Sequence, residues 1–274
     1  FFHNNYKAIK KQFCLYKFIT SRNFPEFDIM HFNKLKLDTK NIVIFRNFKT
    51  KIFPNNKGMY IELPDTWDQY EKKIGKSLLS NTKRKIKKLE KLGELQLKIL
   101  KTEQLDSDTI KNIFNTLFSQ KSSRYINTGN KDIFIENAYK NFYMDMPSKI
   151  SDTAQTHLSL LKLNNEIIAL HWGVVQENNF FWILPTFSEK WMWYSPGRII
   201  MYMLIKWNIE NKKQVFDFTI GNEKYKNDWA NNEIKLFEIM YPKNYKGKIY
   251  IYMEKIKRVI KNNYFIYKIV KNFR

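Results

Sequence analysis

Residues 157–184, HLSLLKLNNEIIALHWGVVQENNFFWIL, contain three apolar runs separated by two short polar turns. The runs are rich in the β-branched and aromatic residues that strands favour. The segments between them, Asn164-Asn165-Glu166 and Gln176-Glu177-Asn178, are short enough for tight hairpin turns. We therefore predict an antiparallel meander whose strands are His157–Leu163, Ile167–Val175 and Asn179–Leu184.

On both sides of this meander the apolar residues adopt the spacing of helices. Asp65 or Thr66 can cap one helix, Asp106 or Ser107 can cap another, and Pro196-Gly197 opens a third. Because helices alternate with a meander and with single strands, the order indicates an α+β fold. The predicted helices are Trp67–Ile74, Leu78–Leu92, Asp108–Lys121, Ile133–Met144 and Arg198–Asn211; the other strands are Ile42–Phe45, Met59–Leu63, Leu95–Leu100, Val215–Phe218 and Phe237–Tyr241; the loops are Pro54–Gly58 and Ser188–Ser195.

The composition limits the choice of function. The chain has 274 residues, 43% of them apolar, which is enough to fill a core. Its formal net charge is +22, yet only seven of the 48 basic residues are arginine. Arginine is the residue that binds phosphates and bases through bidentate hydrogen bonds. Its scarcity, with a general richness in Lys, Asn, Ile, Phe and Tyr, favours a solvated lysine surface over selected binding of tRNA, phosphate or anionic lipid.

Cysteine and histidine usage argues against other chemistries. Cys14 is the only cysteine, so the chain has no internal disulfide framework. The four histidines are scattered without ligand spacing, and we expect no metal cofactor. No apolar run approaches the roughly 18 residues that span a bilayer. We expect a cytoplasmic protein, or one peripheral to the inner face of the membrane.

Two predicted helices combine a lysine-rich face with an apolar stripe. Leu78–Leu92 fits either an ordinary surface helix or a face that binds an anionic ligand beside a cleft. Residues 248–274 form a basic amphipathic pattern that can lie on an anionic membrane or pack on its own domain. The stripe positions of this second helix are Ile249, Met253, Ile256, Ile260, Asn263, Tyr267 and Val270.

Three local patterns, in order along the chain, are more specific. They are Glu62-Leu63-Pro64 followed by Trp67, Tyr70 and the basic run Asn81–Lys91; Tyr194-Ser195-Pro196-Gly197 at the start of a helix; and Phe216-Asp217-Phe218 followed by Gly221-Asn222-Glu223-Lys224-Tyr225-Lys226 and Trp229. Over about residues 60–240 the combination resembles the GNAT-type domain of the CelD-like and BioF2-like acetyltransferases, which is related to the FemAB aminoacyl-tRNA ligases. The resemblance implies a mixed, mainly antiparallel sheet flanked by helices. We expect residues 1–58 to be the remnant of a preceding, first GNAT-like region, 59–242 to be the GNAT-like domain, and 243–274 to be a basic C-terminal helix.

The resemblance also implies transfer of an acyl group from acetyl-CoA or another acyl-CoA to an amine on a polysaccharide, a peptide or a small molecule. Many GNAT enzymes hold the pyrophosphate of coenzyme A with a Q/R-x-x-G-x-G/A loop. Here Tyr194-Ser195-Pro196-Gly197-Arg198 stands in its place, which leaves the donor open. A helix that starts there offers N–H groups to phosphates, Gly197 permits close approach and Arg198 can add a charged contact; the alternative is a simple helix cap. Lys226 could hold a phosphate or the loop, and the resemblance implies backbone oxyanion donors within Trp182–Thr186.

Two carboxylates are candidate general bases, because a carboxylate near apolar groups has a raised pKa. Asp217, between two phenylalanines, is either a base or a buried anchor. Glu223 is either a general base or a residue that binds an amine or a sugar hydroxyl of the acceptor. Tyr225 is the candidate that protonates a leaving thiolate. His171 shares a face of small residues and either lines a cleft or is structural.

One geometric expectation tests this hypothesis. The strands Phe180–Leu184 and Val215–Phe218 should be neighbours that separate, with the helix from Arg198 starting at the gap. Two rival functions remain: a FemAB-like enzyme that uses an aminoacyl-tRNA, and a non-catalytic module that binds the membrane surface.

Overall fold

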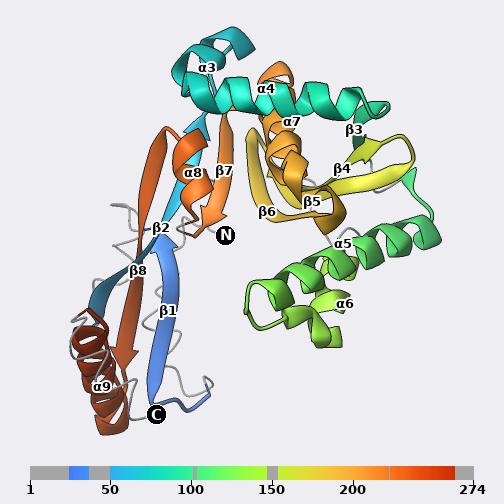
Figure 1. Cartoon of the computed structure of the whole chain (residues 1–274). Coiled ribbons are helices and arrows are strands. Elements are labelled where there is room, and N and C mark those ends of the chain that lie inside the picture. The colour runs from blue at the N-terminus through green and yellow to red at the C-terminus, as the bar shows by residue number, and fades with distance from the viewer. Residues whose placement is uncertain (1–24, 37–49, 101–103, 147–153, 222, 263–274) are drawn as a thin grey trace. The chain divides into compact units, whose positions relative to one another are not determined.

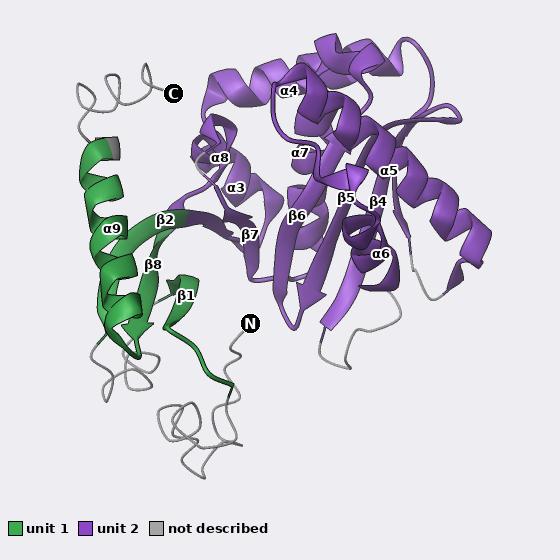
Figure 2. Ribbon diagram, turned by 90° about the horizontal axis from the view of Figure 1, so that it is seen from below, with its two compact units in different colours: residues 1–57, 234–274 green, residues 58–233 purple. Residues whose placement is uncertain are grey.

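The computed structural model describes residues 25–36, 50–100, 104–146, 154–221 and 223–262. It divides the chain into two compact units (Figure 2). Unit 1 comprises residues 1–57 and 234–274, and unit 2 comprises residues 58–233. The elements in chain order are β1(Ile29–Lys36), β2(Lys51–Glu62), α3(Trp67–Lys73), α4(Lys76–Glu90), β3(Leu95–Leu100), α5(Ser107–Asn127), the 3₁₀ helix η2(Ile133–Ile135), α6(Asn137–Asp145), β4(Ala154–Leu163), β5(Glu166–Gln176), β6(Asn179–Phe187), the 3₁₀ helix η4(Glu189–Tyr194), α7(Pro196–Glu210), β7(Val215–Ile220), α8(Lys224–Trp229), β8(Asn232–Pro242) and α9(Tyr245–Asn262).

The sheet of unit 2 has the order β2-β7-β6-β5-β4-β3 (Figure 1). The pairs β2–β7, β3–β4, β4–β5 and β5–β6 are antiparallel, and β6–β7 is parallel. The predicted meander is confirmed as β4–β5–β6, with turn residues Asn164 and Glu177 at φ 52°. Such left-handed backbone at the first turn residue suits two-residue hairpins. The α+β class and the mixed, mainly antiparallel sheet are therefore confirmed.

Helices cover both faces of this sheet (Figure 1). On one face α7 packs on β4, β5 and β6, and α4 and α3 pack on α7. On the other face α5 packs on β6, with η2 and α6 beside it. Strand alternation separates the two cores: Ala169 of β5 belongs to the α7 core, whereas Leu170, Trp172 and Val174 belong to the α5 core.

Local signals account for several boundaries. Thr66 caps α3, because its Oγ1 accepts the N–H of Gln69 at 3.4 Å. Asp106 caps α5 by accepting the N–H of Thr109 at 2.8 Å. The tyrosine of the first motif, Tyr70, is 2% exposed and donates to the Trp229 carbonyl at 3.1 Å. This hydrogen bond ties α3 to the end of α8.

Other predictions of local structure are wrong. Pro54–Gly58 lies within β2 and not in a loop, because sheet pairing overrides its turn propensity. Gly58 instead marks an irregularity in the register between Gly58 and Tyr60. Ser188–Ser195 contains the 3₁₀ helix η4, and Ile133–Met144 is divided into η2 and α6. The predicted strand Ile42–Phe45 lies outside the described residues.

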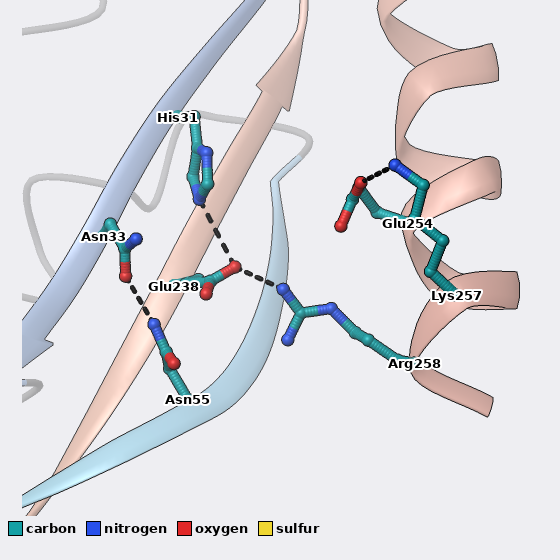
Figure 3. Close-up of polar contacts among 7 residues, drawn as sticks. All are labelled: His31, Asn33, Asn55, Glu238, Glu254, Lys257 and Arg258. Atoms are coloured by element: carbon teal, nitrogen blue, oxygen red, sulfur yellow. Dashed lines mark hydrogen bonds and ion pairs between the residues drawn. The ribbon is translucent and has the colours of Figure 1, made fainter. Parts of the chain in front are cut away.

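Unit 1 contains β1, the residues of β8 from 234 onward, the first part of β2, and α9. β1 pairs antiparallel with β8, and α9 packs against β1. Glu238 of β8 is 6% exposed, and its carboxylate is hydrogen-bonded to His31 of β1 and to Arg258 of α9 (Figure 3). Within the part of the chain that is described, no helix is both long and apolar enough to cross a membrane.

Candidate active site

The parallel strands β6 and β7 pair only where they begin. Their register is Asn179↔Val215, Phe180↔Phe216 and Phe181↔Asp217, although both strands continue beyond it. From there the strands separate, which confirms the geometric expectation from the sequence. Later residues of both strands, among them Trp182, Pro185 and Thr219, line one cavity.

This cavity has a volume of about 560 Å³ and is bounded by four further segments besides the two strands. Gly197 and Arg198 come from the start of α7, Met192 from η4, and a row of polar side chains from α5. Glu223, Tyr225, Lys226 and Trp229, from α8 and the residue before it, complete the wall. The space is large enough for an extended ligand, and its polar groups come from three separate helices.

The first turn of α7 is arranged to receive an anion. Ser195 precedes the helix in the left-handed conformation, at φ 54° and ψ 53°, and does not cap it. Its Oγ instead accepts a hydrogen bond from the ammonium of Lys85 on α4 at 2.6 Å. Lys85 also donates a hydrogen bond to the Trp193 carbonyl at 3.0 Å. Burial lowers the pKa of Lys85, and the neighbouring charge of Arg198 lowers it further. A helix N-terminus beside two cations is a favourable place for phosphate.

Gly197 contributes space at this turn. A Cβ on Gly197 would lie 3.0 Å from the ring of Phe187, which also lines the cavity. Of the N–H groups in this turn, those of Arg198 and Ile199 donate to the Ser195 carbonyl, and the one of Gly197 has no partner among the described residues. Tyr194, predicted in the same motif, instead packs beside Trp191, with ring centroids 5.8 Å apart, and does not line the cavity.

The segment after β7 brings a carboxylate and a buried lysine together. Glu223 and Lys226 form an ion pair at 2.9 Å, and Lys226 also donates to the Ile220 carbonyl at 3.1 Å. Gly221 is at φ 142°, a backbone conformation that favours glycine, and a Cβ there would displace the Glu223 carboxylate. Lys226 is 3% exposed, whereas the Glu223 side chain is 54% exposed. The carboxylate can thus meet a ligand while the ammonium fixes its position.

Tyr225 lies on α8, a short helix that is not among the predicted helices. Burial is the main cause that raises the pKa of its hydroxyl to about 12; a hydrogen bond with Trp182 and the charge of Arg124 act against this rise, and the charge of Glu223 adds to it. The hydroxyl is therefore protonated near neutral pH and can donate a proton or a hydrogen bond. It lines the same cavity as Glu223.

The profile of the acetyltransferase (GNAT) domain family matches residues 76–227, more than half of the chain. The chain belongs to the GNAT acetyltransferase domain family. The matched segment starts with α4 and ends within α8, so it includes β6, β7, the α7 N-terminus and Glu223. Membership in this family makes the protein an acyltransferase.

Solved structures share the fold at low sequence identity. L-PGS from Bacillus licheniformis aligns with a TM-score of 0.56 and 14% identity over 85% of this chain and 73% of that chain. FemX aligns with a TM-score of 0.55 and 11% identity over 78% of this chain and 72% of that chain. A third structure is the C-terminal DUF2156 domain of an Agrobacterium fabrum protein named as a lysylphosphatidylglycerol synthetase. It aligns with a TM-score of 0.56 and 11% identity over 82% of this chain and 71% of that chain. Such likenesses establish the fold alone, and no curated protein matches the chain.

Asp217 of the GNAT domain lies on β7, directly before the cavity-lining residues Phe218 and Thr219. Its neighbours Phe216 and Phe218 are fully buried and Asp217 is half-buried, as alternation along a strand requires. The carboxylate accepts the N–H of Thr219, a residue with left-handed backbone at φ 59°, at 2.6 Å. This contact fits the anchor interpretation, and Asp217 is not among the residues that line the cavity.

His171 is enclosed in the core on the α7 side of the sheet. It is completely buried and stacks on Trp182, with centroids 4.2 Å apart and planes 6° apart. Burial lowers the pKa of the imidazole well below its usual value, so the ring is neutral. Since His171 does not line the cavity, we assign it no part in the chemistry proposed below.

The sequence reading missed two cations of the GNAT domain on α5. Lys121 donates to the Pro185 carbonyl at 3.1 Å, and burial lowers its pKa to about 8. Arg124 lies over the ring of Phe187, 4.7 Å from its centroid. Both line the cavity. Both continue the inward-facing stripe of Leu117 and Phe118 at helical spacing, but the predicted helix ended at Lys121.

Proposed function

We propose that the GNAT domain transfers an acyl group from an acyl-CoA to an amine inside the cavity between β6 and β7. The observation that carries this proposal is the early end of the β6–β7 pairing, together with an uncapped helix N-terminus at the same cavity. A thioester chain can lie in the opening between the strands while its phosphates meet the first turn of α7. Consumption of acyl-CoA by the purified chain, followed as thiol release with a panel of amines, tests it.

Donor binding rests on Gly197, Arg198 and Lys85. The Gly197 amide has no hydrogen-bond partner among the described residues, and the two cations lie at the same turn. Ser195 positions Lys85 through the 2.6 Å contact and so contributes indirectly. We assign Lys226 a positioning function as well, because its ammonium is occupied by Glu223 and the Ile220 carbonyl.

The chemistry requires three groups besides the substrates. The amine nitrogen attacks the thioester carbonyl and passes a proton to the Glu223 carboxylate, the C–S bond breaks, and the Tyr225 hydroxyl protonates the departing sulfur. The register of β5 with β6 goes from Trp172↔Leu184 to Gly173↔Trp182, which leaves Ile183 as an extra residue. Such a bulge frees backbone groups from the ladder, and Ile183 lines the cavity. Its amide is our candidate oxyanion donor.

Replacing Tyr225 with phenylalanine should lower kcat by about tenfold with an alkyl thioester donor. The loss is smaller than for most general acids, because a thiol of pKa about 8.5 leaves readily near neutrality. An aryl thioester, whose leaving thiol needs no protonation, should react equally with both proteins. Steady-state rates with the two donors check this. Equal losses for both donors would assign the hydroxyl to another function.

Lys121 should make the activity depend on pH. Because burial lowers its pKa to about 8, Lys121 changes from cation to neutral amine as the pH rises through about 8. We propose that the ammonium binds negative charge in the cavity. The ratio of kcat/KM for the wild type to that for Lys121→Met should therefore fall as pH rises from 7 to 9. The ratio cancels the titration of the acceptor amine, and a ratio that instead rises through pH 8 would identify Lys121 as a base.

The acceptor is proposed only as a class. A half-exposed carboxylate can receive an amine from a polysaccharide, a peptide or a small molecule, and we favour a cell-envelope precursor, as in the CelD-like and BioF2-like branch that the sequence resembles. An amine panel that includes amino sugars and peptide amines separates these acceptors.

A second candidate donor is an aminoacyl-tRNA, as in the FemAB relatives of that branch. The observation in its favour is the basic face of α4, from which Lys85 reaches the α7 N-terminus. The exposed basic residues Lys83, Arg84, Lys87, Lys88 and Lys91 could contact an RNA backbone. Binding assays with coenzyme A and with charged tRNA discriminate the two donors.

A further inference from the structure

The helix α9 of unit 1 has two opposite faces. Its inner face, Gly247, Ile251, Glu254 and Arg258, is buried or half-buried. A second set at the same spacing is turned to solvent, with side chains between 38% and 68% exposed. This set, called the outer stripe, consists of Tyr245, Ile249, Tyr252, Ile256 and Val259.

Helix geometry makes the outer stripe one continuous surface. At 3.6 residues per turn, spacings of four and three keep its members within about 80° of the helix circumference, roughly opposite the inner face. Two predicted stripe positions, Ile249 and Ile256, are in this set, and a third, Met253, lies at its edge and is also exposed. The predicted stripe is therefore confirmed from Ile249 to Ile256, whereas Ile260 is half-buried and Asn263, Tyr267 and Val270 lie outside the described residues. The helix packs on its own unit with a different face.

Specific contacts fix the inner face in place. Arg258 pairs with the buried Glu238, which His31 also contacts at 3.3 Å (Figure 3). The Arg258 guanidinium also lies over the ring of Phe53, 4.8 Å from its centroid. Gly247 lies so close to the Asp28 carbonyl that a Cβ would collide with it. Rotation of α9 to bury the outer stripe would break these contacts and leave the Glu238 carboxylate buried without its cation.

Lysines border the outer stripe on both sides. By helical position, Lys248 and Lys255 lie along one edge, and Lys246 and Lys257 lie along the other. All four are exposed, and Lys257 is paired with Glu254 at 2.6 Å. An apolar stripe between two rows of lysine complements the apolar interior and anionic headgroups of a membrane surface.

We propose that α9 docks on an anionic lipid surface, lying in its plane with the outer stripe immersed. Immersion in lipid removes the exposed branched aliphatic side chains from water, which is favourable, whereas contact with RNA phosphates would not do so. RNA is therefore disfavoured as the ligand of this surface. A second copy of the chain is disfavoured because the lysine rows of the two copies would face each other. The proposal is independent of the acyl-transfer chemistry.

The test is flotation of the full chain with vesicles of phosphatidylglycerol and phosphatidylcholine in equal amounts, and with vesicles of phosphatidylcholine alone. The wild type should float with the anionic vesicles only. The triple variant Ile249→Ser/Ile256→Ser/Val259→Ser should lose at least about tenfold in partition coefficient, because three immersed aliphatic side chains are removed. The matched control, Leu92→Ser/Ile126→Ser/Ile135→Ser, removes three exposed apolar side chains of unit 2 and should float as the wild type does.

A charge variant tests the same surface independently. Lys246→Gln/Lys248→Gln/Lys255→Gln should lower binding to the anionic vesicles by about 100-fold, since each lysine near such a surface contributes roughly fivefold. A wild type that ignores anionic vesicles would overturn the proposal, as would a serine variant that binds unchanged. The proposal also fails if light scattering finds a dimer that the serine triple variant dissociates, or if that variant loses tRNA binding.

Discussion

Glu223→Gln should lower kcat by about 10²–10⁴ at saturating acyl-CoA, which is the usual contribution of a positioned general base. The carboxylate lines the cavity, is half-exposed, and is fixed by Lys226 at 2.9 Å. Glutamine preserves the size of the side chain and an oxygen that still accepts from Lys226, but it cannot take a proton from the amine. The measurement is steady-state thiol release together with calorimetry of donor binding.

The variant should fold with reduced stability. Lys226 is 3% exposed, so the change removes the counter-charge of a buried ammonium, although the glutamine oxygen can still accept its hydrogen bond. We therefore expect the free energy of unfolding to fall by about 1–3 kcal/mol. The affinity for the donor should be unchanged, because no phosphate contact is assigned to Glu223. A variant that retains full turnover would remove Glu223 from the chemistry and leave only its structural pairing with Lys226.

Asp217→Asn is the matched control on the neighbouring strand. Its carboxylate accepts a hydrogen bond from the Thr219 N–H at 2.6 Å, so the amide should weaken a charged hydrogen bond and lower stability by about 1 kcal/mol. Turnover should fall by less than about tenfold. If Asp217→Asn instead abolishes turnover at unchanged melting temperature, the two carboxylates have exchanged functions.

The parts of this fold that the sequence predicts are those with a local signal. Apolar runs separated by short polar turns indicate the meander, and Pro196-Gly197 marks the start of α7. The separation of β6 from β7 follows from the resemblance, and the register confirms it. Local propensity failed where tertiary pairing decides, as in Pro54–Gly58, whose turn residues are held in β2.

The candidate site is predictable only in part, because its walls are distant in the sequence. Glu223, Tyr225, Gly197 and Arg198 have motif context, and all four line the cavity. Lys121 gains its importance from the Pro185 carbonyl, 64 positions away, which no local pattern indicates. His171 was a candidate because its strand face is small, but Trp182 of the next strand covers that face.

Gly197→Asp should weaken donor binding by at least about 10- to 100-fold, which corresponds to the roughly 1.5–3 kcal/mol of one charged hydrogen bond. The new carboxylate would lie in the first turn of α7, where it repels phosphate and attracts Arg198. The variant should still fold, because an acidic residue near a helix N-terminus favours the helix. Isothermal calorimetry with coenzyme A is the measurement, and melting curves verify folding.

Gly197→Ala separates charge from bulk. Its Cβ would meet the Phe187 ring at the same 3.0 Å, which a shift of a few tenths of an ångström relieves, and it carries no charge. We therefore expect alanine to cost much less affinity than aspartate. If both variants bind coenzyme A as the wild type does, the α7 turn does not hold the donor phosphates. If the wild type itself binds charged tRNA and no coenzyme A, the turn serves an aminoacyl donor, and Gly197→Asp should then weaken that binding instead.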